Sequence, residues 1–150
     1  MYAERLPKEM GFYCDPYSQF GQLSSELWRA CRLVVDTGLH DGRWSREQAI
    51  SYLVETTPKV DAEAVRAVER YLVDPGQATA YTIGMQEILK LRRRAQSILG
   101  AAFDIRVFHD VLLRLGAMPL PLLTEAVLER LPAAAATAGS TVLESRWPKV

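Results

Sequence analysis

Tyr81 is the residue whose type and position most directly suggest chemistry. It lies on an otherwise apolar stripe of a predicted helix, and Gly84 follows it within one helical turn. A glycine inside a helix costs about 1 kcal/mol relative to alanine, so we expect another backbone or a ligand to approach closely at Gly84. A tyrosine in such a stripe is most often a core residue whose hydroxyl bonds to the backbone. The alternative is a phenol that points into a cleft, where it could stabilise an oxyanion.

Metal chemistry has few candidate ligands in this chain. The two histidines, His40 and His109, are far apart in the sequence, and the two cysteines are Cys14 and Cys31. Neither a Cys-x-x-Cys nor a His-Glu-x-x-His pattern occurs, and these spacings are typical of zinc sites. We therefore expect no metal ion and no other cofactor in this chain. Cys31 falls on an apolar helical face, which favours a reduced and buried thiol.

Composition and charge limit the partners. A chain of 150 residues with 49% hydrophobic content is long enough for one domain with a sizeable core. Eighteen basic and eighteen acidic residues cancel, which argues against a nucleic-acid partner. No apolar run approaches the roughly 20 residues of a membrane span, and the N-terminus lacks the layout of a signal peptide. We therefore expect no membrane partner and a cytoplasmic location.

The position of Tyr81 depends on a long helix predicted over residues 74–100. Asp74 is its expected N-cap. Pro75 follows at the first helical position, where the N–H that proline lacks would have no partner in any case. Gln77 can complete a capping box with Asp74, and Gly100 provides the stop. The remaining helices must pack around this one.

Six further helices are predicted from apolar residues that recur every three to four positions. They cover residues 1–10, 16–38, 45–56, 61–73 and 104–116, and a last helix begins near Pro119 or Pro121 and ends at residue 131. Side-chain caps are expected at Asp15, Ser45 and Asp104, where Phe103 can also pack onto Phe108. No alternating strand pattern is longer than four residues, so the fold is predicted to be all-α, a bundle of about six to seven helices. Residues 1–131 form the predicted domain. Residues 132–150 lack a sustained apolar stripe and are predicted to be a loosely ordered tail.

Two groups of charged residues lie on the predicted helices. Glu26, Arg29 and Arg32 can share part of one helical face, where a solvated ion pair worth a few tenths of a kcal/mol is the simplest expectation. Arg106 and His109 are three residues apart and lie on adjoining faces of a later helix. The first helix has no N-cap before it, which is typical of a chain cut from a longer one.

Several motifs occur together in a fixed order. They include Met-Gly-Phe-Tyr-Cys-Asp-Pro-Tyr at 10–17, Leu-Val-Val-Asp-Thr-Gly-Leu-His at 33–40, Pro-Gly-Gln-Ala-Thr-Ala-Tyr at 75–81 and Phe-Asp-Ile-Arg-Val-Phe-His-Asp at 103–110. With these motifs the chain resembles the C-terminal part of the bacterial family called domain of unknown function 885, over residues 1 to about 131. Full-length members of that family resemble zinc metallopeptidases. The resemblance therefore implies the C-terminal portion of a larger helical fold.

The resemblance also shows a departure from the family pattern. Family members carry a His-Glu-x-x-Pro-Gly-His-His segment upstream and then a Glu-Gly-Trp-Ala-Leu-Tyr-Ala-Glu helix, whose first glutamate resembles a further metal ligand. Only Tyr2, Ala3 and Glu4 of that helix are present here. A catalytic zinc needs three protein ligands and an open position for water. Zinc is therefore expected in full-length members and not in this chain.

The resemblance suggests roles for four residues. Related helical metallopeptidases place a tyrosine against the tetrahedral intermediate, which implies a catalytic role for Tyr81. Gln77, one turn earlier, would face the same cleft. Arg106 and His109 would contact a peptide carboxylate or carbonyl, because a guanidinium forks onto a carboxylate.

Three functions remain open at this point. The chain is the C-terminal part of a zinc-peptidase-like protein, forms one wall of a peptide-binding cleft and is inactive alone; or it is a non-enzymatic all-α interaction module; or it is a truncated gene product. The expected partners are a peptide substrate in the full-length context, and either a second copy of the chain or a separate N-terminal half. Association is expected through an apolar face that includes Tyr2, Leu6, Phe20 and Leu23.

Overall fold

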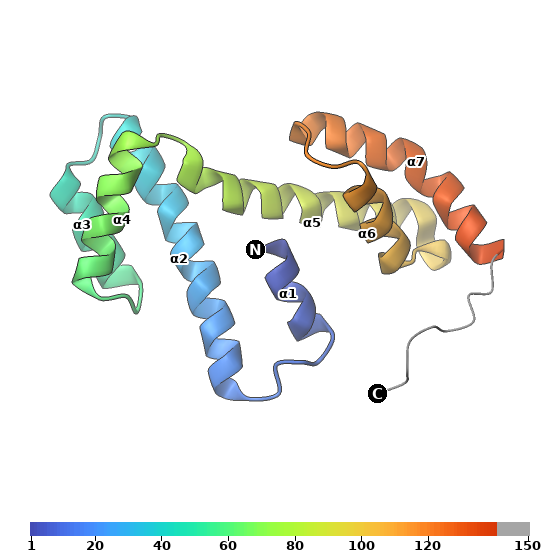
Figure 1. Cartoon of the computed structure of the whole chain (residues 1–150), viewed down its shortest axis with the longest axis horizontal. Coiled ribbons are helices and arrows are strands. Elements are labelled where there is room, and N and C mark those ends of the chain that lie inside the picture. The colour runs from blue at the N-terminus through green and yellow to red at the C-terminus, as the bar shows by residue number, and fades with distance from the viewer. Residues whose placement is uncertain (141–150) are drawn as a thin grey trace. The chain divides into compact units, whose positions relative to one another are not determined.

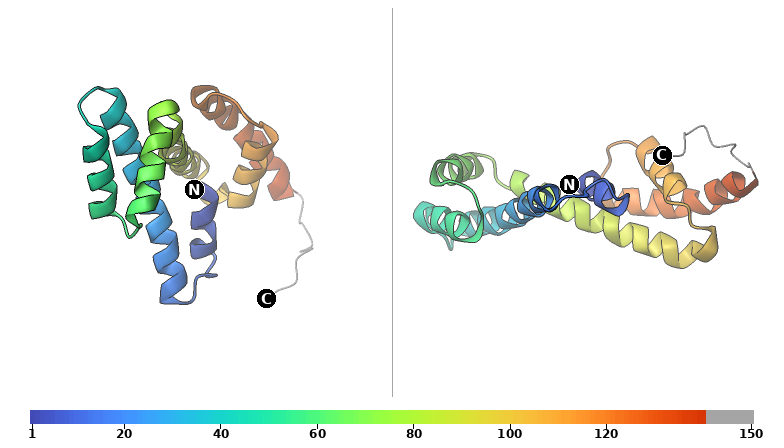
Figure 2. Two further views of the ribbon diagram at one scale, coloured as in Figure 1. Left: turned by 60° about the vertical axis from the view of Figure 1, so that its left-hand side comes forward. Right: turned by 90° about the horizontal axis from the view of Figure 1, so that it is seen from below.

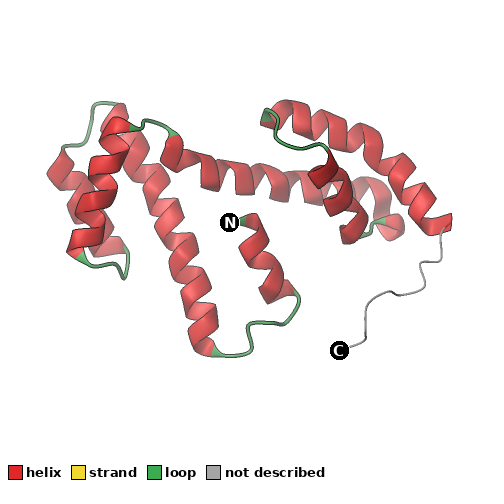
Figure 3. Cartoon of the chain, in the orientation of Figure 1, coloured by secondary structure: helices red, strands yellow, loops and turns green. Residues whose placement is uncertain are grey.

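The computed structural model describes residues 1–140, and within them every regular element is helical (Figure 1, Figure 3). The α-helices are α1 (Tyr2–Glu9), α2 (Pro16–His40), α3 (Arg46–Thr56), α4 (Asp61–Val73), α5 (Ala80–Leu99), α6 (Ile105–Arg114) and α7 (Leu120–Ser140), and two 3₁₀ turns are η1 (Gln77–Thr79) and η2 (Gly100–Ala102). The all-α prediction is confirmed.

The chain divides into two compact units within α5. The first unit comprises residues 1–86 and the second begins at Glu87. Each unit has a hydrophobic core of its own. The expectation of one domain over residues 1–131 stays a prediction.

The core of the first unit lies between α2, α3 and α4, which lie side by side in Figure 1 and in the left view of Figure 2. Its buried side chains are Cys31, Val35, Ala49, Leu53, Ala64, Val68, Tyr71 and Ala78. Cys31 is a free thiol and 3% exposed, as its place on the apolar face predicted. The predicted capping box fixes the start of α3, because Ser45 accepts from the backbone of Gln48 and the side chain of Gln48 accepts from the backbone of Ser45.

The core of the second unit lies between the later part of α5, α6 and α7. Its buried side chains are Leu91, Ala95, Phe108, Val111, Leu123, Val127 and Leu131. The predicted cap of α6 is present, because the Asp104 carboxylate accepts from the backbone N–H of Arg106 at 2.7 Å. Phe103 packs onto Phe108, with ring centroids 6.1 Å apart.

The start of the long helix differs from the prediction. Asp74 caps the end of α4 instead, and Gly76 adopts a positive φ of 81° before η1 begins at Gln77. The α-helix proper begins only at Ala80. No other backbone of the described residues approaches Gly84, because a Cβ built there meets nothing within 4 Å. The alternative, a ligand close to Gly84, stays a prediction.

The last helix is longer than predicted. It was expected to end before Pro132, yet α7 continues to Ser140 with Pro132 inside it. The alanines after Pro132 are strong helix formers, and Leu131 and Ala134 both pack in the core of the second unit. Residues 141–150 of the predicted loose tail lie outside the described residues, so that expectation stays a prediction.

Candidate functional site

Arg32, on α2, is the centre of the most unusual polar cluster in the first unit. Its side chain is 8% exposed, although arginine is rarely buried. The guanidinium carbon lies 4.9 Å from the ring centroid of Tyr81 and 5.4 Å from that of Tyr71, within range for cation–π attraction. Its Nη2 donates to Oε1 of Gln77 at 3.1 Å. Two residues that the sequence analysis selected, Gln77 and Tyr81, therefore contact the same guanidinium.

This contact determines which groups Gln77 and Tyr81 can offer to a ligand. A guanidinium has no acceptor, so Gln77 must present its carbonyl oxygen to Arg32, and its amide nitrogen points elsewhere. Within residues 1–140 the structure gives neither that amide nitrogen nor the Tyr81 hydroxyl a hydrogen-bond partner, and the Tyr81 side chain is 41% exposed. The cluster therefore carries two neutral donors held by one buried cation.

Asp36 fixes the backbone on which these donors lie. Its carboxylate is 2% exposed and accepts from the N–H of Gly76 at 2.9 and 3.1 Å and from the N–H of Ala78 at 3.1 Å. These are donors at the start of η1, where a helix leaves its N–H groups unpaired. Asp36 thus performs the capping role that was predicted for Asp74.

Tyr71 and His40 complete the surroundings of Arg32 and Asp36. Burial raises the pKa of the Tyr71 hydroxyl above its ordinary value of 10.0, with Arg32 and Arg70 acting in the opposite direction. Tyr71 is therefore a neutral phenol at physiological pH. The His40 Nε2 lies 2.8 Å from the carbonyl oxygen of Tyr71 and 3.8 Å from Oδ1 of Asp36.

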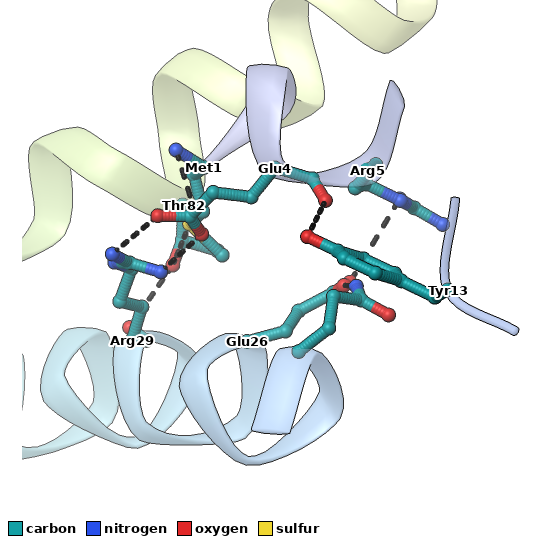
Figure 4. Close-up of polar contacts among 8 residues, drawn as sticks. Met1, Glu4, Arg5, Tyr13, Glu26, Arg29 and Thr82 are labelled. Atoms are coloured by element: carbon teal, nitrogen blue, oxygen red, sulfur yellow. Dashed lines mark hydrogen bonds and ion pairs between the residues drawn. The ribbon is translucent and has the colours of Figure 1, made fainter. Parts of the chain in front are cut away.

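A polar network ties α1 to α2 and to the first turn of α5 (Figure 4). Arg29 forks onto the Glu4 carboxylate at 2.5 and 2.8 Å, and the Thr82 hydroxyl donates to the carbonyl oxygen of Arg29 at 3.0 Å. Arg5 lies 3.8 Å from Glu26. The expected solvated pair among the α2 charges is wrong, because Arg29 and Glu26 both pair with α1 and Arg32 is buried.

Arg106 and His109 lie on α6, in the second unit. The Arg106 guanidinium is already engaged with Asp104, which it contacts at 2.5 to 3.1 Å. The ring of His109 lies beside that of Phe108, with centroids 5.6 Å apart. Arg106 would have to release Asp104 before it could fork onto a peptide carboxylate. Their predicted substrate contacts stay predictions.

Neither a group of three metal ligands nor a membrane-spanning helix occurs in the part of the chain that the structure describes. In residues 1–140 no three side chains of His, Cys, Asp or Glu come together as a metal site requires. These residues by themselves do not fit a zinc ion. Over the same range no helix is both long and apolar enough to span a bilayer.

The fold and the Arg32 cluster define an all-α segment of a helical protein, in which one buried cation holds two donors, the exposed Tyr81 and the half-buried Gln77. The chain belongs to the family of bacterial proteins of unknown function DUF885, whose family model matches residues 1–127.

A solved structure is also similar to this chain. The chain is similar to a "putative lipoprotein" from Colwellia psychrerythraea, with 49% sequence identity and a TM-score of 0.85. The similarity covers 88% of this chain and 23% of the longer one, so this chain spans less than a quarter of its neighbour. No curated protein matches the chain.

Proposed function

We propose that this chain contributes one wall of a peptide-binding cleft in a larger metallopeptidase-like DUF885 fold, and that it is inactive alone. The observation that carries the proposal is the pair of unengaged donors, the Tyr81 hydroxyl and the Gln77 amide, held against Arg32. Oxyanion stabilisation requires donors that are fixed before the reaction begins. The Arg32 guanidinium supplies that fixation for both side chains.

In this proposal Tyr81 donates to the oxyanion that forms when the peptide carbonyl is attacked. Gln77 lies beside it and binds a substrate carbonyl oxygen through its amide nitrogen. Asp36 takes no part in the chemistry but fixes the start of the helix that carries both residues. In full-length family members the expected zinc would activate water, and residues 1–140 bring no three potential ligands together that would hold it on their own.

The test is Tyr81→Phe in a complete family member that carries this segment and a zinc site. Because the Tyr81 hydroxyl has no partner within residues 1–140, we expect the free energy of unfolding to change by less than about 0.5 kcal/mol. We expect kcat to fall by about 10²-fold, as loss of one oxyanion donor does elsewhere.

Tyr71→Phe is the matched control for that experiment. Its ring also contacts Arg32 but is 2% exposed, so loss of its buried hydroxyl should reduce stability by about 1 kcal/mol and leave kcat unchanged. A Tyr81→Phe enzyme that keeps full turnover would refute the catalytic role. A complete, zinc-loaded protein without peptidase activity would refute the proposed reaction.

An uncovered apolar stripe on α2 indicates an interaction surface, which a segment of a larger fold and a non-enzymatic interaction module would both need. Phe20, Leu23, Leu27 and Val34 follow helical spacing and are 63, 53, 43 and 36% exposed. Since this chain spans 23% of its structural neighbour, we propose that the rest of the DUF885 fold covers this stripe.

Leu23→Glu tests whether the rest of the DUF885 fold covers the stripe. In a complete family member we expect it to cost about 2 kcal/mol or more, because a charge would be buried, and in this chain alone less than about 0.5 kcal/mol. Equal and small effects in both would show that the stripe stays uncovered. Loss of self-association in this chain alone would instead identify a second copy as the occupant.

A further inference from the structure

A pocket of about 430 Å³ lies in the first unit between α2 and α4. It shares Arg32 with the proposed cleft, and its other lining residues have no role there. Four of its lining side chains are cationic, namely Arg29, Arg32, Lys59 and Arg66, and one, Glu63, is acidic. The whole chain has a formal net charge of zero, so this concentration of positive charge is a local feature.

Two of the four cations already have partners. Arg29 forks onto Glu4, and the Lys59 ammonium lies 3.3 Å from a Glu63 carboxylate oxygen. Arg32 and Arg66 have no carboxylate within 4.0 Å in the described part of the chain. The pocket therefore keeps an excess of two positive charges.

The burial of Arg32 makes that excess costly. A charged group removed from water needs an opposite charge or a full set of hydrogen bonds, and the partners of Arg32 in the described residues are all neutral: Gln77, Tyr71 and Tyr81. Its Nε is buried and has no hydrogen-bond partner. An unused donor on a buried cation without a counter-charge is the arrangement expected where an anionic ligand belongs.

The shape of the pocket narrows the class of anion. Its volume is several times that of a bare ion, and Trp28 contributes an apolar wall beside the cations. Guanidinium groups match the planar fork of a carboxylate. We propose that this pocket binds an organic carboxylate whose apolar side group packs against Trp28. The inference does not depend on the catalytic role of Tyr81, because binding is measured without turnover.

The experiment is a titration of the whole chain with N-acetylphenylalanine, followed by calorimetry and by the indole N–H resonance of Trp28. The carboxamide of N-acetylphenylalanine has the same size and no charge, and it serves as the control ligand. We expect the carboxylate to bind with a dissociation constant on the order of 1 mM and to shift the Trp28 resonance. We expect the carboxamide to bind about tenfold more weakly, and added salt to reduce only the carboxylate affinity.

Arg66→Gln removes the exposed cation of the pocket without touching the core. We expect it to weaken carboxylate binding about fivefold, whereas Arg70→Gln, one turn further along α4 and outside the pocket, should leave the affinity unchanged. Equal affinity for carboxylate and carboxamide, or an unchanged affinity in Arg66→Gln, would overturn the proposal. Tighter binding of inorganic phosphate than of N-acetylphenylalanine would overturn the assignment to a carboxylate.

Discussion

Asp36 offers the most direct test of how the Tyr81 helix is held. The residue is 2% exposed, and its two carboxylate oxygens accept from two backbone donors, the N–H groups of Gly76 and Ala78. Asp36→Asn keeps the size and one acceptor oxygen. Its amide group, however, would place an N–H where the carboxylate accepts from Gly76. Asp36→Ala removes both acceptors.

The expected magnitudes follow from these contacts. A hydrogen bond to a charged group contributes about 1.5–3 kcal/mol, and leaving a buried donor without a partner costs about 1–3 kcal/mol. Asp36→Asn loses the charge and one acceptor, so we expect it to destabilise the chain by about 2 kcal/mol. Asp36→Ala leaves the part-buried N–H of Gly76 and the buried N–H of Ala78 without their acceptor, and we expect it to cost about 4 kcal/mol or to prevent folding of the first unit.

The assay is urea unfolding followed by tryptophan fluorescence, together with the backbone amide resonances of Gly76 and Ala78 in Asp36→Asn. Asp41→Asn is the matched control, since Asp41 follows α2 directly but its carboxylate is 59% exposed and paired only with Arg43. It should change stability by less than about 0.5 kcal/mol. The reasoning fails if Asp36→Asn is as stable as Asp41→Asn, or if the Gly76 and Ala78 resonances stay in place.

Two further outcomes are expected. Gly38→Ala should destabilise the chain by about 1–3 kcal/mol, because the new Cβ would lie 2.7 Å from Cδ2 of Trp44. Gly21→Ala, in the same helix, should stabilise the chain by about 0.5–1 kcal/mol, because a Cβ there meets nothing within 4 Å. The urea midpoints of the two variants check both expectations. The hydrogen bond from the Arg106 side chain lowers the pKa of Asp104 below 3.8, so the stability it contributes is complete above about pH 5 and is lost as the pH falls through that lowered pKa. Acid unfolding of Asp104→Asn should accordingly depend less steeply on pH than that of the unmodified chain, and identical acid profiles would contradict this.

Local signals explain the parts of the fold that the sequence predicts well. The caps at Asp15, Ser45 and Asp104 each accept from a backbone N–H two or three residues away, so the residues that define these helix starts are adjacent in the sequence. Apolar periodicity places Cys31 and Phe108 correctly in the two cores, because that pattern is also set by residues close together in the sequence.

Long-range contacts explain the errors. The start of η1 is set by Asp36, which is 40 residues before Gly76, so a capping rule applied to neighbouring residues selects Asp74 instead. Gly84 was expected at a close approach because glycine is costly in a helix, but its neighbourhood within the described residues is open. A glycine in a helix indicates a packing constraint only where the opposing group can be identified, as Trp44 can for Gly38.

Arg32 and Asp36 show most clearly why the site itself was only half predictable. They are one turn apart on α2, a spacing at which opposite charges on a helix surface are expected to pair. Here each instead reaches the segment that leads into α5, Arg32 through Gln77 and Asp36 through Gly76. One turn of α2 therefore holds both the start of that segment and the donors on it. The position of Tyr81 relative to a ligand should consequently respond to changes on α2, a helix to which the sequence analysis assigned no site residue.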